Sequence, residues 1–184
     1  MPELCLLQVH AHPDDEASKG AGTTAKYAAE GVRTVLVCCT GGEAGDILNP
    51  AVDTPEVRAN LHAVRMAELQ ASVDAIGYSS LHMLGYRDSG MPDTDENRLP
   101  DNFANAPLEE AVGRFVRIIR AERPQVIITY RDEQLFSSLF ALFRRGENLD
   151  ARGRLLEFAI VAIKIPGVSQ VSRLADRITE NLVR

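Results

Sequence analysis

The sequence of 184 residues contains no tryptophan and only three cysteines, and no histidine follows His82. An odd cysteine number with Cys38 and Cys39 adjacent has neither the spacing of a metal site nor the pairing of a disulfide framework. The apolar runs, such as 4–9 and 158–163, fall far short of the roughly 20 residues that span a bilayer. These absences argue against a disulfide-rich secreted domain and a membrane protein, and they favour the cytoplasm.

Basic residues are also too few for a polyanion-binding protein. The chain carries 20 Lys and Arg against 26 Asp and Glu, a net charge of -6. Nucleic-acid and anionic-membrane surfaces need clustered Lys and Arg, so we expect neither partner and favour a small-molecule substrate. With 45% hydrophobic and 25% charged residues, the composition is that of a soluble globular protein. The length fits a single domain, residues 1–184.

Buried strands alternate with helices along the first 130 residues, which predicts a parallel sheet. We expect strands over 4–10, 33–39, 81–84 and 125–130, and helices over 18–30, 55–76 and 108–121. Such βαβ units pair strands in parallel with right-handed crossovers, so the carboxyl ends meet at one sheet edge. The prediction is a Rossmann-like three-layer α/β fold with a mostly parallel sheet and an atypical C-terminal part.

Several boundaries have specific signals. Gly31 is a typical helix stop, while Thr54 and Pro55 read as the N-cap and first residue of a helix. The loop over 86–105 is long enough to be functional. Residues 155–165 fit either a fifth strand or a buried helix. Further helical patterns cover 135–143 and 171–183.

The run from Val9 to Glu16, VHAHPDDE, closes the first strand with a histidine and adjacent carboxylates. His12, Asp14 and Asp15 thus follow a buried strand at its carboxyl end, where open α/β sheets bind ligands. Imidazole and carboxylate are both zinc donors, and a catalytic zinc usually takes three protein ligands and a water. The motif therefore indicates metal chemistry and requires a third donor from elsewhere in the fold.

Three stretches together resemble the LmbE-like (PIG-L) zinc deacetylases: HPDDE at 12–16, Gly-Gly-Glu at 41–43 and RDSGM at 87–91. Ser18-Lys19-Gly20 and residues 40–50 are closer to the amidases of this family that act on mycothiol conjugates than to their sister deacetylases. The resemblance covers residues 3 to 130. It implies a Zn²⁺-dependent hydrolase that cleaves an amide on a glucosamine-inositol core, with an N-acyl glucosamine or a mycothiol conjugate as substrate.

The resemblance also implies residue roles. By motif position, His12 and Asp15 would be zinc ligands and Asp14 the general base. This agrees with the chemistry, because zinc lowers the pKa of bound water towards ~7 and a nearby carboxylate can take the proton. Arg65 and Asp88 match positions that contact the polar substrate. Lys19 would lie near the mouth and hold the distal part of a conjugate.

One departure from the family concerns the third zinc ligand. Family members follow the fourth strand with a glycine-rich loop and His-Pro-Asp-His, whereas here Tyr130 is followed by RDEQL. We interpret 131–184 as a divergent segment, replaced or truncated, beyond a family-like core over 1–130. Asp132 or Glu133 could complete the site, and the alternative is a catalytically inactive family member without a third ligand. An exposed sheet edge would favour a homo-oligomer.

The residues of the site also have ordinary structural interpretations. A strand-end turn with carboxylates at a helix N-terminus explains His12, Asp14 and Asp15 without a metal. Arg65 would then pair with Glu56 or Glu68, and Asp88 would cap the turn at Gly90.

Other candidates outside the motif are weaker. We expect His10 to be a packed strand residue, and His62 and His82 to be structural or exposed. Cys38 and Cys39 read as buried thiols, not nucleophiles. The glycines at 41–42 lack the spacing of a nucleotide-binding loop, which disfavours a metal-free nucleotide-binding module.

Overall fold

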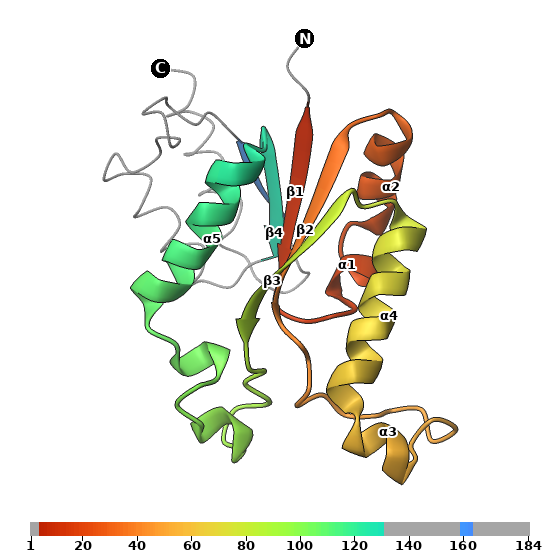
Figure 1. The fold of residues 1–184 in the computed structure, drawn as a ribbon, viewed down its shortest axis with the longest axis vertical. Helices are drawn as coiled ribbons and strands as arrows, with labels where there is room; N and C mark the ends of the chain where they lie inside the picture. Colours follow the sequence, from red (N-terminus) through yellow and green to blue (C-terminus); the bar gives the residue numbers. More distant parts are fainter. Residues whose placement is uncertain (1–3, 131–158, 164–184) are drawn as a thin grey trace.

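A computed structural model describes residues 4–130 and 159–163 (Figure 1). Within them, neighbouring strands of one sheet pair in parallel in the order β3-β2-β1-β4-β5. The Rossmann-like α/β prediction is thus confirmed, with β1 at the centre. The strands are β1 Cys5–His10, β2 Arg33–Thr40, β3 Ser80–Tyr86, β4 Val126–Tyr130 and β5 Ala159–Ile163.

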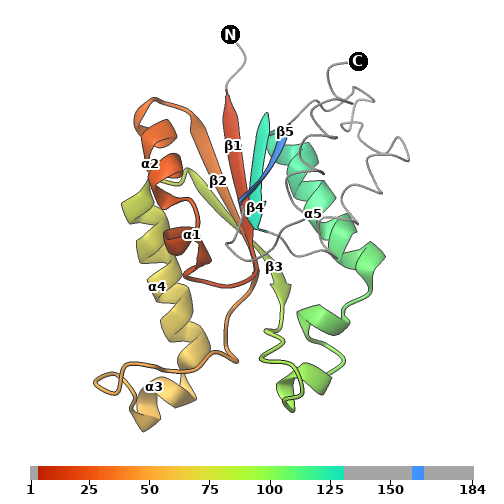
Figure 2. The ribbon, with the colours of Figure 1, turned by 180° about the vertical axis from the view of Figure 1, so that it is seen from behind.

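Helices cover both faces of the sheet, which makes three layers (Figures 1 and 2). One face carries α1 Asp15–Ser18, α2 Ala21–Ala29 and α4 Leu61–Ile76, and the other carries α5 Leu108–Glu122. The short helix α3 Pro55–Ala59 and the 3-10 turns η1 Glu96–Arg98 and η2 Phe103–Asn105 lie beyond the carboxyl ends of the strands. The loops that follow β1, β2 and β3 therefore gather at that edge.

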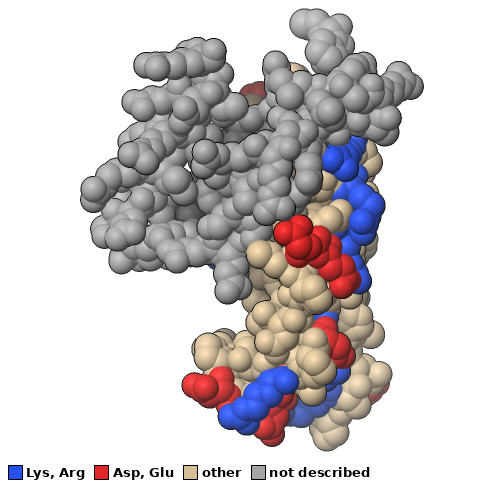
Figure 3. Space-filling view, turned by 90° about the vertical axis from the view of Figure 1, so that its left-hand side faces the viewer, with Lys and Arg blue, Asp and Glu red and all other residues tan. Residues whose placement is uncertain are grey.

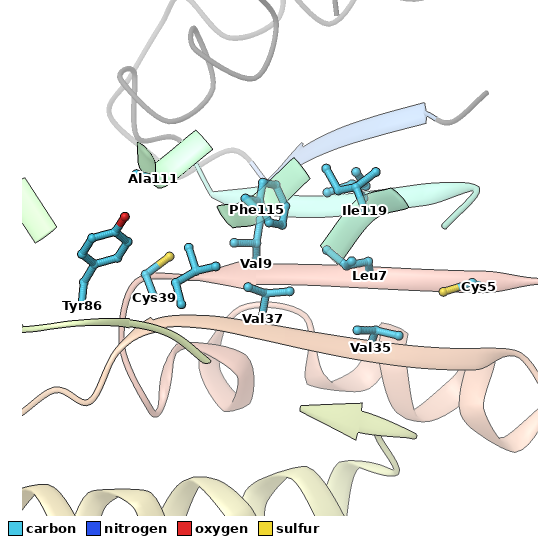
Figure 4. Packing of buried hydrophobic residues seen from close by; sticks show 12 residues of the cluster. Cys5, Leu7, Val9, Val35, Val37, Cys39, Tyr86, Ala111, Phe115 and Ile119 are labelled. Atoms are coloured by element: carbon cyan, nitrogen blue, oxygen red, sulfur yellow. The ribbon is translucent and has the colours of Figure 1, made fainter. Parts of the chain in front are cut away.

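The core lies on both sides of β1 and β2, because both faces of these strands are covered. Leu7, Val9 and Val37 are fully buried and face Phe115 of α5 (Figure 4). Complete burial of one such side chain contributes roughly 1.5–3 kcal/mol. On the opposite face a second buried cluster joins the sheet to α4 and its following turn: Leu36, Cys38, Leu69, Val73 and Tyr78.

A chain of buried polar groups also lies on the α2 face. The side-chain oxygen Oε1 of Gln8 accepts a hydrogen bond from the Tyr78 hydroxyl at 2.8 Å and lies 2.9 Å from His10 Nε2. The side-chain nitrogen Nε2 of Gln8 donates to Thr24 Oγ1 at 2.5 Å and to the Gly20 carbonyl at 3.3 Å. An amide with two acceptor and two donor positions is thereby satisfied, as burial requires.

Most predicted element boundaries agree with the structure, but two helices are interrupted. The predicted helix over 18–30 breaks at Gly20, where φ is +118°, and the helix over 55–76 breaks at Asn60. Thr54 caps α3 as predicted, since its side chain accepts from the Val57 N–H at 3.2 Å. Residues Ala159–Ile163 form a strand, which resolves the open choice for 155–165. The patterns at 135–143 and 171–183 lie outside the described residues.

The described surface carries mixed charge. Figure 3, which views the side of α5, shows Lys and Arg interspersed with Asp and Glu on the part that is coloured. Among the described residues, every helix is too short or too polar to traverse a bilayer.

Candidate active site at the carboxyl edge of the sheet

The segments after β1, β2 and β3 are held together by hydrogen bonds that backbone N–H groups donate. The Thr40 N–H donates to the Ala11 carbonyl at 2.9 Å, joining the loops after β2 and β1. The Asp88 side chain accepts from the Ala44 N–H at 3.3 Å, while its own N–H donates to Glu43 Oε1 at 3.1 Å. The predicted meeting of the strands' carboxyl ends at one sheet edge is confirmed, because the segments that follow β1, β2 and β3 contact one another there.

His12 lies between two carboxylates, one on each side of its ring. Its Nδ1 is 3.7 Å from Asp15 Oδ2, and its Nε2 is 3.3 Å from Asp88 Oδ1. Both carboxylates are buried, whereas 43% of the His12 side chain is exposed. The structure therefore brings together three of the residues that the sequence singled out, with the His12 side chain partly exposed.

These contacts set the charge of the site. The carboxylates of Asp15 first and Asp88 second raise the pKa of His12 to about 9. Burial opposes ionisation of Asp88, but its hydrogen bonds with His12 and with the N–H groups of Gly90 and Ala44 outweigh burial and lower its pKa. The ammonium of Lys19 forms an ion pair with Asp15 Oδ1. Lys19 thus compensates the buried Asp15 carboxylate, and His12 compensates that of Asp88.

Asp14 lies beside this cluster but points to a different partner. Its carboxylate accepts from Arg65 Nη2 at 2.6 Å, and most of the side chain is exposed. The Arg65 guanidinium also donates to the Pro13 carbonyl at 2.6 Å and to the Gly42 carbonyl at 2.9 Å. Arg65 therefore does not pair with Glu56 or Glu68; it joins the loops after β1 and β2 around Asp14.

Two glycines make room for that guanidinium. A Cβ on Gly42 would lie 2.7 Å from Arg65 Cζ, and one on Gly45 would lie 2.5 Å from Arg65 Nη1. Gly42 also has φ +67°, a region that favours glycine. The loop is thus shaped around an arginine from α4. Sequence reasoning missed this role, although the spacing of glycines on both sides of Glu43 was a visible signal.

The remaining candidate residues are either buried in the core or paired with other groups. Asp88 caps the turn by accepting from the Gly90 N–H at 3.1 Å, as its structural interpretation predicts, and also contacts His12. His10 is buried, and burial lowers its pKa to about 4. Cys38 is buried, as expected, and burial raises the pKa of its thiol to about 12. Cys39 is buried as well.

His62 and His82 have carboxylate neighbours that the sequence spacing did not reveal. His62 Nδ1 lies 4.0 Å from Glu43 Oε2, and His82 Nε2 lies 2.6 Å from Glu122 Oε1. Both carboxylates come from distant parts of the chain, so no local motif marks them. Their partners agree with the expected structural roles.

The spacing of His12 and Asp15 can be compared with that of two ligands of one metal ion. Zinc bonded to an imidazole nitrogen and a carboxylate oxygen at about 2.0–2.1 Å, with a tetrahedral angle, separates the two atoms by about 3.3 Å. The observed 3.7 Å between His12 Nδ1 and Asp15 Oδ2 is close to that value. Residues 4–130 and 159–163 contain no group of three His, Cys, Asp or Glu side chains that could hold a metal. Asp132 and Glu133 lie outside the described residues.

The comparison with known families decides the ancestry. Residues 7–136 match the family described as PIG-L: GlcNAc-PI de-N-acetylase. The chain belongs to the PIG-L family. The resemblance carried by the motifs at 12–16, 41–43 and 87–91 is thereby confirmed.

Curated PIG-L relatives match the same part of the chain. It is 47% identical over 131 residues to mycothiol S-conjugate amidase from Streptomyces coelicolor, a match that covers 70% of this chain and 44% of that protein. It is 44% identical over 135 residues to 1D-myo-inositol 2-acetamido-2-deoxy-alpha-D-glucopyranoside deacetylase from Geodermatophilus obscurus, covering 70% and 46%. The chain spans less than half the length of these relatives.

Solved structures share the PIG-L fold at low identity. N,N'-diacetylchitobiose deacetylase from Pyrococcus horikoshii superposes with a TM-score of 0.61 at 19% identity, over 97% of this chain and 70% of that one. The 4-carboxy-2-hydroxymuconate hydratase from Pseudomonas putida gives 0.58 at 17% identity, over 82% and 58%. One fold thus carries a deacetylase and a hydratase, so the reaction must be argued from the site.

Proposed function

We propose that this PIG-L chain is a zinc-dependent hydrolase that cleaves an amide of a small N-acyl glucosamine or mycothiol-type conjugate. The observation that carries the proposal is the placement of His12 Nδ1 and Asp15 Oδ2 3.7 Å apart, with Asp14 between them in sequence and exposed. The identity to an amidase and a deacetylase of glucosamine-inositol compounds supports the substrate class.

In this proposal, His12 and Asp15 hold the zinc. Asp88 faces the other ring nitrogen of His12, the position of the carboxylate partners that orient metal-ligating histidines. Bound zinc would supply a Lewis acid that polarises the amide carbonyl and acidifies water. The ligand must be neutral imidazole, so the proton held on His12 competes with the metal.

Asp14 is proposed as the general base. Its carboxylate is exposed and belongs to the same turn as His12 and Asp15, and as the base it would accept a proton from the attacking water. Lys19 pairs with Asp15, Arg65 with Asp14, and Asp88 lies 3.3 Å from His12. We propose these three side chains as the contacts of a polar substrate, on the basis of the family resemblance. All three side chains have protein partners, and Lys19 is the most accessible of them, since 30% of its side chain is exposed against 15% for Arg65 and 6% for Asp88.

The presence or absence of a third zinc ligand distinguishes an active enzyme from a non-catalytic family member. Asp132 or Glu133 follows β4, which pairs with β1, and is our candidate for the active enzyme. A second candidate function is a non-catalytic family member that binds the sugar without hydrolysing it. The observation that favours it is the sequence after His82, which contains no histidine to serve as third ligand.

A calorimetric zinc titration of the metal-stripped full chain tests the proposal. We expect binding of one zinc per chain that His12→Ala and Asp15→Ala abolish and that the control His62→Ala leaves unchanged. Hydrolysis of an N-acyl glucosamine-inositol substrate should then accompany the zinc-loaded protein, and Asp14→Asn should keep the metal while losing turnover. Weak binding that does not depend on His12, with no hydrolysis, supports the non-catalytic function instead.

A further inference from the structure

The backbone of Asp14 adopts a conformation that L residues seldom take. Its φ is +88° and ψ is -23°, and α1 begins at the next residue. Such a residue keeps this conformation only when its surroundings hold it. The proposed base is therefore attached to a strained point of the chain, and the groups that fix this point determine where its carboxylate lies.

Glu16 holds the Asp14 backbone. The Asp14 N–H donates to Glu16 Oε2 at 2.9 Å, and Ser72 Oγ donates to Glu16 Oε1 at 2.6 Å. Glu16 is 1% exposed, so its carboxylate is enclosed between the motif and α4. One buried side chain thus ties the amide of Asp14 to a helix that is 56 positions away in sequence from Glu16.

The arrangement is specific to Asp14 and is not ordinary packing. A buried carboxylate is costly unless hydrogen bonds satisfy it, and an apolar side chain of similar size would fill the same space without that cost. Here one carboxylate oxygen is directed at the N–H of a left-handed residue. Arg65 holds the other end of Asp14, at the carboxylate. Asp14 is therefore fixed at its backbone and at its side chain.

We propose that Glu16 is a positioning residue for Asp14, acting through the hydrogen bond to the Asp14 amide and anchored by Ser72. The inference rests on the proposed function only where it takes Asp14 to be the base. Whether Glu16 holds the Asp14 amide can be tested independently of any catalytic activity.

Two substitutions of nearly equal volume test this role. Glu16→Met removes both carboxylate acceptors and fills the space, whereas Glu16→Gln keeps an amide oxygen that can accept from the Asp14 N–H. In the full-length protein, NMR hydrogen exchange should show a protected Asp14 amide in the wild type and in Glu16→Gln. In Glu16→Met the Asp14 amide should exchange at least tenfold faster, while amides of β1 keep their protection.

Kinetics supply the second measurement. Glu16→Met should lower kcat about 100-fold, with KM and the zinc stoichiometry unchanged, because a displacement near 1 Å has an effect of that size. Glu16→Gln should recover most of the kcat. Ser72→Ala should give an intermediate loss in both measurements, and it replaces Glu16→Met if that variant does not fold.

The outcomes separate the two claims. If the Asp14 amide of Glu16→Met stays protected, or if Glu16→Gln behaves like Glu16→Met in both measurements, the positioning role is overturned. If the wild type hydrolyses no amide, the proposed function fails, while hydrogen exchange at Asp14 still decides whether Glu16 holds that residue.

Discussion

The guanidinium of Arg65 on α4 donates a hydrogen bond of 2.6 Å to the Asp14 carboxylate, across 51 positions of sequence. The same group donates to the carbonyls of Pro13 and Gly42. A planar guanidinium can serve several acceptors in fixed directions, which the point charge of lysine cannot. Arg65 therefore links the turn that bears the proposed base to the loop after β2.

Arg65→Lys should lower kcat about tenfold or more with little change in KM, because the ammonium cannot reach all three acceptors. Steady-state kinetics on the zinc-loaded protein measure this. Arg58→Lys, on exposed α3, is the matched control and should leave both constants unchanged. A rise in KM at constant kcat would instead assign Arg65 to substrate binding alone.

Gly42→Ala should destabilise the fold by about 1–2 kcal/mol, because a Cβ at φ +67° is strained and would press on Arg65. Turnover should fall as well, since Arg65 must move. Gly22→Ala is the control in α2, where a Cβ meets nothing within 4 Å. It should stabilise the protein by about 0.5–1 kcal/mol. Urea unfolding should show a lower free energy of unfolding for Gly42→Ala and a higher one for Gly22→Ala than for the wild type.

Gln8→Met should cost about 2–4 kcal/mol, because it leaves the Tyr78 hydroxyl and the Thr24 hydroxyl without their buried partner. Tyr78→Phe removes only one bond of the same network and should cost about 1 kcal/mol. The free energy of unfolding in urea provides the comparison. Equal losses in the two variants would show that the amide contributes no more than its bond to Tyr78.

Glu122 should make stability depend on acid pH. Burial opposes its ionisation, but His82 and Arg33 outweigh burial and lower its pKa below the ordinary value of 4.5. Since the folded-state pKa is below the unfolded one, the stabilisation is present above pH 4.5 and is lost as the pH falls through the folded-state pKa. Glu122→Gln should weaken the dependence of the unfolding free energy on pH below about pH 5. Glu30→Gln, on an exposed ion pair, should leave the slope unchanged.

The sheet was predictable because its central strands are buried on both faces, which produces continuous apolar runs such as Val35 to Cys39. The helix breaks at Gly20 and Asn60 could not be predicted, because the helical pattern of the sequence continues across each of them. A short apolar run also fits strand and helix equally, so pairing with β4 was needed to identify β5.

The site was predictable where its residues are neighbours in sequence. His12 and Asp15 share one turn, and the pairing of parallel strands brings Asp88 to the same edge. The partners of Asp14 were not predictable, because Arg65 reaches it from α4 and Ser72 contacts Glu16 only through the packing of that helix. Contacts between distant segments leave no spacing that a motif search can detect.

The three thiols of this chain, Cys5, Cys38 and Cys39, are buried in the two central strands. Alkylating reagents attack a thiolate, which burial suppresses, so modification requires the sheet to open. The rate of alkylation therefore reports the opening free energy of β1 and β2 directly. In a protein without tryptophan fluorescence, these cysteines are built-in reporters of the strands that support the turn bearing His12 and Asp15.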